Sequence, residues 1–267
     1  MAQPTVLATN TGVIQCGDDP FLGSTTFTKT GLSIEAEAKT VIIVAGLYSN
    51  AKSITDITFN DGNSNVPVVG TFPFVRASSE TKPRNANRAV VFDLSNSSAS
   101  SLASITVTCD TAHQYEMMIY VLYTDGFLQS AFTDMSFGNT YDFNIHNPNF
   151  LNSRTVVISL KDDDNDIGDV ETVAVGSNAS IITQLASIPG KIGSDDFCFA
   201  AIQTTDSLID SLYPYELRNA ANDGLGQVEY CANFTFQISS QKNPFQGGTF
   251  KIIDSLSDDA AFAAIFD

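Results

Sequence analysis

The chain has 267 residues, of which 43% are hydrophobic and only 16% are charged, a composition that supports a buried core and excludes a disordered tail. It carries 30 acidic and 13 basic residues, and its net charge of −17 repels phosphate backbones and anionic lipids. We therefore expect neither a nucleic-acid partner nor a membrane partner.

The first half of the chain is predicted to be a series of short strands. Residues 32–38 alternate between apolar and polar, and residues 41–48 form an apolar run that we expect to be buried on both faces. The strand predicted at 54–59 ends at the Asn-Asp-Gly-Asn turn of residues 60–63. Residues 66–75 contain two prolines, which favours an edge strand or a loop. Further strands are expected at 89–94, 105–109 and 115–123.

Part of this strand pattern occurs twice. The β-branched run at residues 40–44 is followed by a polar turn and the strand at 54–59, and the same order returns at residues 155–159 and 170–175. The repetition predicts two similar β domains, which we place at residues 1–126 and 154–267.

Between these domains, residues 127–153 carry many aromatic side chains among polar and turn residues, so we predict a connector packed against one or both domains. In the second domain, strict alternation at residues 228–238 predicts an antiparallel strand with one solvated face. Short helices are expected at 207–213, capped by Asp206 and ended by Pro214, and at 258–266, capped by Ser257. The predicted fold is all-β, with two tandem antiparallel, jelly-roll-like β-sandwiches and short helices in the second.

The chain has few of the residues and motifs that catalysis usually requires. It has two histidines, His113 and His146, and none of the common motifs for hydrolases, nucleotide binding or zinc proteases. We predict no catalytic residue and no enzymatic activity. A glycosidase remains an open alternative, because two carboxylates on different strands leave no local signature.

One dense acidic segment spans residues 161–169. Closely spaced carboxylates suit Ca²⁺, but Ile167 and Val173 occupy positions where an EF-hand requires Gly and Glu. The segment is either a solvated acidic turn or a weak Ca²⁺ site, to which Asp195 and Asp196 could contribute from another loop. No other cofactor is expected, and the candidate ligands are Asp162, Asp164, Asp166 and Asp169.

The four cysteines form no C-x-x-C pair, and buried free thiols are the default expectation. A disulfide between Cys198 and Cys231 is left open, since it depends on whether their strands are neighbours.

Three segments are candidates for contacts between subunits. A basic loop stands out in this acidic chain, and is either solvated or docked on the acidic face of an identical subunit. The aromatic connector is the second candidate. A C-terminal apolar stripe is the third, and packs on its own core or on a neighbour. The candidate interface residues are Arg76, Lys82, Arg84, Arg88, Phe127, Phe132, Phe262 and Phe266.

Residues 31–126 resemble the jelly-roll-like β-sandwich modules of bacteriophage structural proteins. The resemblance lies in the buried strand at 40–44, the hairpin at 53–62 and the closing segment at 118–126. It implies a non-enzymatic virion structural protein, most readily a capsid-surface component (decoration, cement or jelly-roll coat) and otherwise a tail component. The implied partners are identical subunits, in a homo-oligomer, and other virion proteins.

The resemblance implies that the protein is located in the virion. Synthesis in the host cytoplasm is expected, because the N-terminal residues show no signal peptide and no apolar run reaches membrane-spanning length. The alternative function is a carbohydrate-binding or adhesin module. Such sites stack sugar rings on aromatic side chains; the chain has no Trp, but Tyr213 and Tyr215 would serve.

Overall fold

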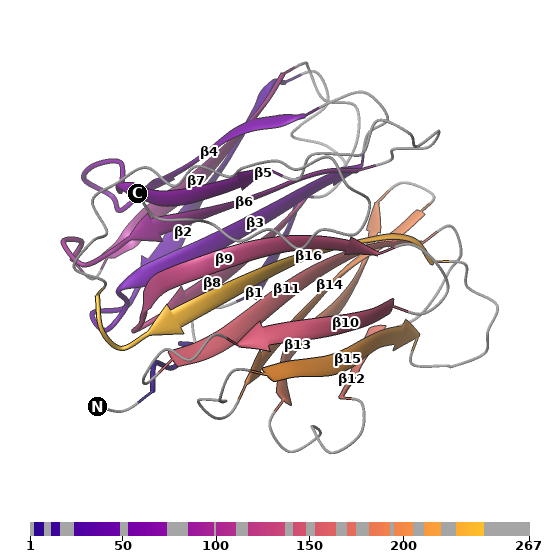
Figure 1. Cartoon of the computed structure of the whole chain (residues 1–267). Coiled ribbons are helices and arrows are strands. Elements are labelled where there is room, and N and C mark those ends of the chain that lie inside the picture. The colour runs from indigo at the N-terminus through magenta and orange to yellow at the C-terminus, as the bar shows by residue number, and fades with distance from the viewer. Residues whose placement is uncertain are drawn as a thin grey trace.

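The computed structural model describes residues 3–7, 12–16, 24–48, 53–73, 85–98, 100–110, 117–136, 141–147, 153–163, 170–174, 182–192, 195–204, 211–219 and 228–242 (Figure 1). Within these residues all regular elements are β-strands, and all strand pairs are antiparallel. The predicted all-β class is therefore confirmed. No helix in this part of the chain is long and apolar enough to cross a membrane.

The first half of the chain, residues 1–126, contributes two sheets. One has the strand order β1-β8-β3-β6-β5 and the other has the order β2-β7-β4. The strands are β1 (Gly12–Cys16), β2 (Thr26–Ile34), β3 (Thr40–Tyr48), β4 (Ile54–Asn60), β5 (Val68–Pro73), β6 (Asn85–Asp93), β7 (Ser100–Cys109) and β8 (Met117–Thr124).

The second half, residues 127–267, also contributes two sheets, with the orders β13-β14-β11-β16-β9 and β10-β15-β12. Strands β9 and β10 lie in the segment predicted as a connector. The strands are β9 (Phe127–Ser136), β10 (Tyr141–Asn147), β11 (Ser153–Asp163), β12 (Val170–Ala174), β13 (Ile182–Ile192), β14 (Asp195–Thr204), β15 (Ser211–Asn219) and β16 (Val228–Ser239).

The strand order of the second half repeats that of the first, with every strand number raised by eight. In each half the pairing is also nested: the first strand pairs with the last, the second with the next to last, and the third with the sixth. The sequence repeat follows this relation, because residues 40–44 lie in β3 and residues 155–159 lie in the corresponding strand β11.

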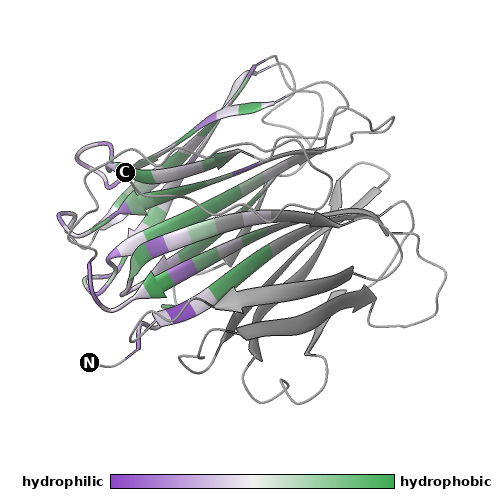
Figure 2. Cartoon of the chain, in the orientation of Figure 1, coloured by the Kyte–Doolittle hydropathy of each residue, from purple (hydrophilic) through white to green (hydrophobic). Residues whose placement is uncertain are grey.

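Strand β3 is buried on both faces, as predicted. Its Val41, Ile43 and Ala45 belong to one hydrophobic cluster, whereas Ile42 and Val44 belong to another. Successive side chains of a strand point to opposite faces of its sheet, so the continuous β-branched run supplies both clusters at once. Figure 2 shows the resulting apolar stretches along the central strands of the first half.

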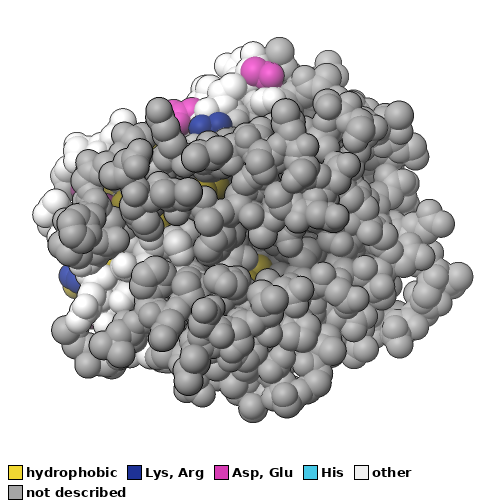
Figure 3. Space-filling model, in the orientation of Figure 1, with side chains coloured by type: hydrophobic (Ala, Val, Ile, Leu, Met, Phe, Trp, Pro, Cys, Tyr) yellow, Lys and Arg dark blue, Asp and Glu magenta, His cyan; other side chains and the backbone are white. Residues whose placement is uncertain are grey.

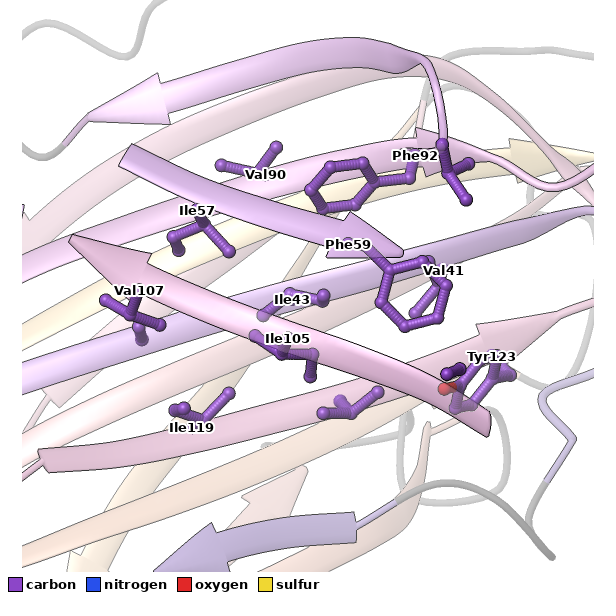
Figure 4. Close-up of a cluster of buried hydrophobic side chains, with 14 of the residues drawn as sticks. Val41, Ile43, Ile57, Phe59, Val90, Phe92, Ile105, Val107, Ile119 and Tyr123 are labelled. Carbon is purple, nitrogen blue, oxygen red and sulfur yellow. The ribbon is translucent and has the colours of Figure 1, made fainter. Parts of the chain in front are cut away.

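The first cluster contains side chains from both sheets of the first half. Figure 4 shows side chains from β4 and β7 meeting those from β3, β6 and β8. Phe59 is central: its ring centroid lies 5.9 Å from that of Phe92 and 6.4 Å from that of Tyr123. Burial also raises the pKa of the Tyr123 hydroxyl, because the charged form would lose its hydration.

The second cluster joins the two halves of the chain. Apolar side chains on the other face of β3, β6 and β8 pack with side chains from β9, β11 and β16. Phe72 of β5 contacts Phe236 of β16 edge to face, with ring centroids 6.0 Å apart. The two large sheets therefore share one buried hydrophobic core.

The predicted turn after β4 is confirmed. Gly62 has a φ of 99°, which favours glycine, and its backbone N–H donates to the Asn60 side chain over 2.8 Å. The Asp61 carboxylate accepts backbone N–H groups from Ser64 and Asn63, both at 2.9 Å, and these bonds lower its pKa. The carboxylate thus supplies the acceptor for two backbone N–H groups of the turn.

Three local predictions are wrong. The strand predicted at 32–38 is β2, which starts at Thr26 and ends at Ile34, because a threonine-rich run pairs with β7 and a turn begins at Glu35. The helix predicted at 207–213 is wrong from Ser211 onward, where β15 pairs with β10 and β12 on both sides. This two-sided pairing outweighs the local capping signal.

The helix predicted at 258–266 lies outside the described residues.

The third error concerns the face of β16 that was predicted to be solvated. Gln237 is fully buried there and accepts a hydrogen bond from the Ser130 hydroxyl over 3.1 Å. Alternation alone cannot distinguish a wet face from a buried one whose polar groups are hydrogen-bonded.

Candidate functional site: the corner between the two halves

Residues 124–127 connect β8 to β9 and form the corner at which the two halves meet. Thr124 is fully buried, and its carbonyl accepts the Lys39 backbone N–H over 2.8 Å. Its hydroxyl accepts the Gly126 backbone N–H over 3.1 Å. The Thr40 hydroxyl, in turn, donates to the Gly126 carbonyl over 2.7 Å. These bonds hold the chain rigidly where it leaves the first half.

Residues 3–7, which we call the strap, lie along this corner. The Thr5 backbone N–H donates to the Asp125 carboxylate over 2.5 Å, and the Thr5 hydroxyl donates to its second oxygen over 3.0 Å. The Thr5 carbonyl accepts the Thr124 hydroxyl over 2.8 Å. Val6 forms a β-bridge with Thr124, and the Leu7 backbone N–H donates to the Tyr123 carbonyl over 2.8 Å.

Gly126 leaves room for the strap. A Cβ atom on Gly126 would lie 2.5 Å from the Cβ atom of Pro4 and 3.1 Å from the Ser239 carbonyl oxygen. Both distances are shorter than a van der Waals contact, so only glycine allows Pro4 and the end of β16 to approach the corner together.

Lys242 forms a second link between the halves, just after β16. Its ammonium group lies 2.7 Å from the Asp93 carboxylate, 3.2 Å from the Ser95 hydroxyl and 5.7 Å from the centre of the Phe127 ring. Burial raises the pKa of Asp93, but hydrogen bonds from Lys242 and Ser95 outweigh it and hold the pKa below its usual value. We call this group the Lys242 clasp.

The Asp93→Asn substitution is expected to lower the free energy of unfolding by about 1 kcal/mol at pH 7, a modest value because Lys242 is half exposed. A carboxylate with a lowered folded-state pKa stabilises the fold above its unfolded pKa of about 3.9, and this contribution is lost as the pH falls through the folded value. Denaturation at pH 7 and at about pH 2.5 should therefore give a difference between wild type and variant only at pH 7. An equal difference at both pH values would contradict the clasp.

Two of the predicted interface residues have described side chains. Arg88 donates to the Ile54 carbonyl over 3.2 Å and thereby links β6 to β4; its pKa is lowered by burial and partly restored by Asp56. Phe127 is partly buried and lies beside Lys242. Phe132 is a β9 residue opposite Thr235 of β16. Five of these candidates lie in parts that the structure does not describe: Arg76, Lys82, Arg84, Phe262 and Phe266.

The acidic segment is described only at its start. Asp162 lies in β11, whereas Asp164, Asp166 and Asp169 lie outside the described residues. The strand register places Asp196 of β14 opposite Asp163, so the two acidic stretches reach the same end of this sheet. No group of three or more potential metal ligands occurs among the residues that the structure describes. The Ca²⁺ site remains a prediction.

Cys198 and Cys231 lie on β14 and β16, which are separated by β11. Both residues are opposite Lys161 of β11. Two strand spacings amount to about 9.5 Å, whereas a disulfide needs Cα atoms within roughly 7 Å. We expect non-reducing peptide mapping of purified protein to find no Cys198–Cys231 disulfide, and recovery of that linked peptide from freshly prepared protein would show that the strand order is wrong.

The corner was not predicted from the sequence. Its contacts join residues far apart in the chain, such as Thr5 with Asp125 and Asp93 with Lys242. The only local signal is Asp125-Gly126, which indicates a turn but not what packs on it.

Among the described residues on the face shown in Figure 3, a few acidic and basic side chains lie at the surface. No family model, curated protein or solved structure matches this chain.

Proposed function

We propose that this protein is a non-enzymatic structural component of a virion, acting at the capsid surface through contacts between subunits. The proposal includes the finer fold: two tandem antiparallel β-sandwiches of the jelly-roll type. A jelly roll is an eight-stranded double sheet made of two Greek keys. The observation that carries the proposal is the nested strand pairing, which occurs once in each half with the same order.

The shared apolar core supports this function. Two jelly rolls joined by one dry interface form a rigid block, and rigid blocks are suited to repeated contacts with identical neighbours. Such contacts would use exposed strand edges and loops. Edge strand β5, with Val68 more than half exposed, is one described edge of this kind.

The predicted contact segments belong to the same proposal. The basic loop would meet an acidic surface of a neighbouring copy, which the chain's net charge of −17 makes abundant. The Ca²⁺ site, the homo-oligomeric state and the virion location are further parts of this proposal.

The test is to follow the size of the purified full-length protein by light scattering and electron microscopy as its concentration rises. We expect closed oligomers or shell-like assemblies whose formation weakens at high salt, because charge complementarity is screened. A protein that stays monomeric under all conditions and binds glycans on an array would instead support the carbohydrate-binding alternative.

A further inference from the structure

We propose that the corner is a docking site for the strap of a second copy of this chain, as well as for its own strap. The inference deepens the proposed function, since it names one contact through which copies in an assembly would be joined. It rests on the geometry of a site whose bound segment is visible: the strap fills the corner, and its contacts define what the corner recognises.

The corner recognises the strap through two features. The first is polar: the Asp125 carboxylate accepts both the backbone N–H and the hydroxyl of Thr5. A residue without a hydroxyl, or proline at this position, would lose one or both bonds. The acceptor is a carboxylate, and hydrogen bonds to a carboxylate are stronger than those to a neutral acceptor.

The second feature is steric and apolar. Gly126 provides the space that Pro4 occupies. Val6 packs against the core shared by the two halves, and Leu7 packs against the core of the first half. The corner thus fits a short extended segment with the sequence Pro-Thr-Val-Leu, which carries one specific pair of donors between apolar anchors.

Exchange between copies requires no new contact. A strap from a second copy makes the same bonds as the chain's own, so the two arrangements have nearly equal contact energy. In dilute solution the chain's own strap occupies the corner in preference to that of a second copy, because its effective concentration there is in the millimolar range. Neighbouring copies in a shell reach a similar local concentration, and there exchange becomes competitive.

Two full-length variants test this inference. Thr5→Pro removes the strap's donors but leaves the corner intact, whereas Gly126→Ala blocks the corner but leaves the strap intact. Neither variant alone can form the contact. An equimolar mixture can, because the strap of the Gly126→Ala chain fits the corner of the Thr5→Pro chain. We expect native mass spectrometry to find heterodimers in the mixture and monomers in each separate sample.

The double variant, with both substitutions in one chain, supplies the matched control: mixed with Gly126→Ala, it should give no heterodimer, because neither chain has a free corner. A synthetic peptide of residues 2–7 provides a second readout and should raise the melting temperature of Thr5→Pro but not of Gly126→Ala. The inference would be overturned if the mixture forms no heterodimer and the peptide does not raise the melting temperature of Thr5→Pro. Neither readout depends on shell assembly, so failure of the proposed function would leave this result intact.

Discussion

Replacing Phe236 with alanine is expected to lower the free energy of unfolding of the whole chain by about 3–5 kcal/mol, the usual cost of deleting a buried aromatic ring. Phe236 is fully buried in the core between the two halves, against Phe72 of β5. Both halves contribute side chains to this core, so we expect them to unfold together. Calorimetry should show one transition, shifted downward by on the order of 10 °C.

The matched comparison is Phe59→Ala, which removes an equally buried ring from the core within the first half. If the halves unfold together, both variants shift the same single transition, and hydrogen exchange in β3 and β11 accelerates in both. Val68→Ala is the neutral control, since Val68 is more than half exposed and such changes cost little. A Phe236→Ala protein with two transitions, one unshifted, would show that the halves are independent.

The strands most accurately predicted from the sequence are those whose own composition decides their structure. The run at residues 41–48 is apolar throughout and begins with four β-branched residues, which predicts a doubly buried strand, and Val41–Ala45 are indeed inaccessible. The repeat at residues 155–159 and the turn at Gly62 were equally visible, because each depends on residues close together in the chain.

The remaining features depend on partners that are distant in the sequence. The alternation at residues 228–238 indicates a strand with two different faces, but it does not reveal that Gln237 is buried and bonded to Ser130, which lies 107 residues away in the sequence. Likewise, Ser211–Tyr213 follow a good helix cap, yet pairing on both sides makes them part of β15. The contacts of the strap and of the Lys242 clasp could not be predicted from the sequence for the same reason, since each joins residues more than one hundred positions apart.

Residues 1–126 produced alone are expected to aggregate or to dimerise. In the whole chain, Ile42, Val44, Tyr120 and Leu122 pack against the second half. Without that half they would form an exposed apolar patch on a sheet, the kind of surface that drives association. Light scattering and the soluble fraction after expression measure this directly.

Substituting Val44 and Leu122 with threonine in this fragment should restore a soluble monomer, because threonine keeps the strand propensity and makes the freed face polar. The same pair of substitutions in the full-length protein should have the opposite effect. There both positions are fully buried, and burying two hydroxyl groups in place of apolar groups costs several kcal/mol, about 1–3 kcal/mol each before any cavity is counted. A melting curve of the full-length variant gives that loss.

The decisive comparison is with Val41→Thr and Ile43→Thr, neighbours on the opposite face of β3 that pack inside the first half. These substitutions should destabilise the fragment and the full-length protein alike, without improving the fragment's solubility. A reversal of sign confined to Val44 and Leu122 therefore identifies the even-numbered face of β3 and β8 as the surface that the second half covers. If instead the unmodified fragment is a soluble monomer, the shared core contributes little, and the two halves are joined by the corner and the Lys242 clasp alone.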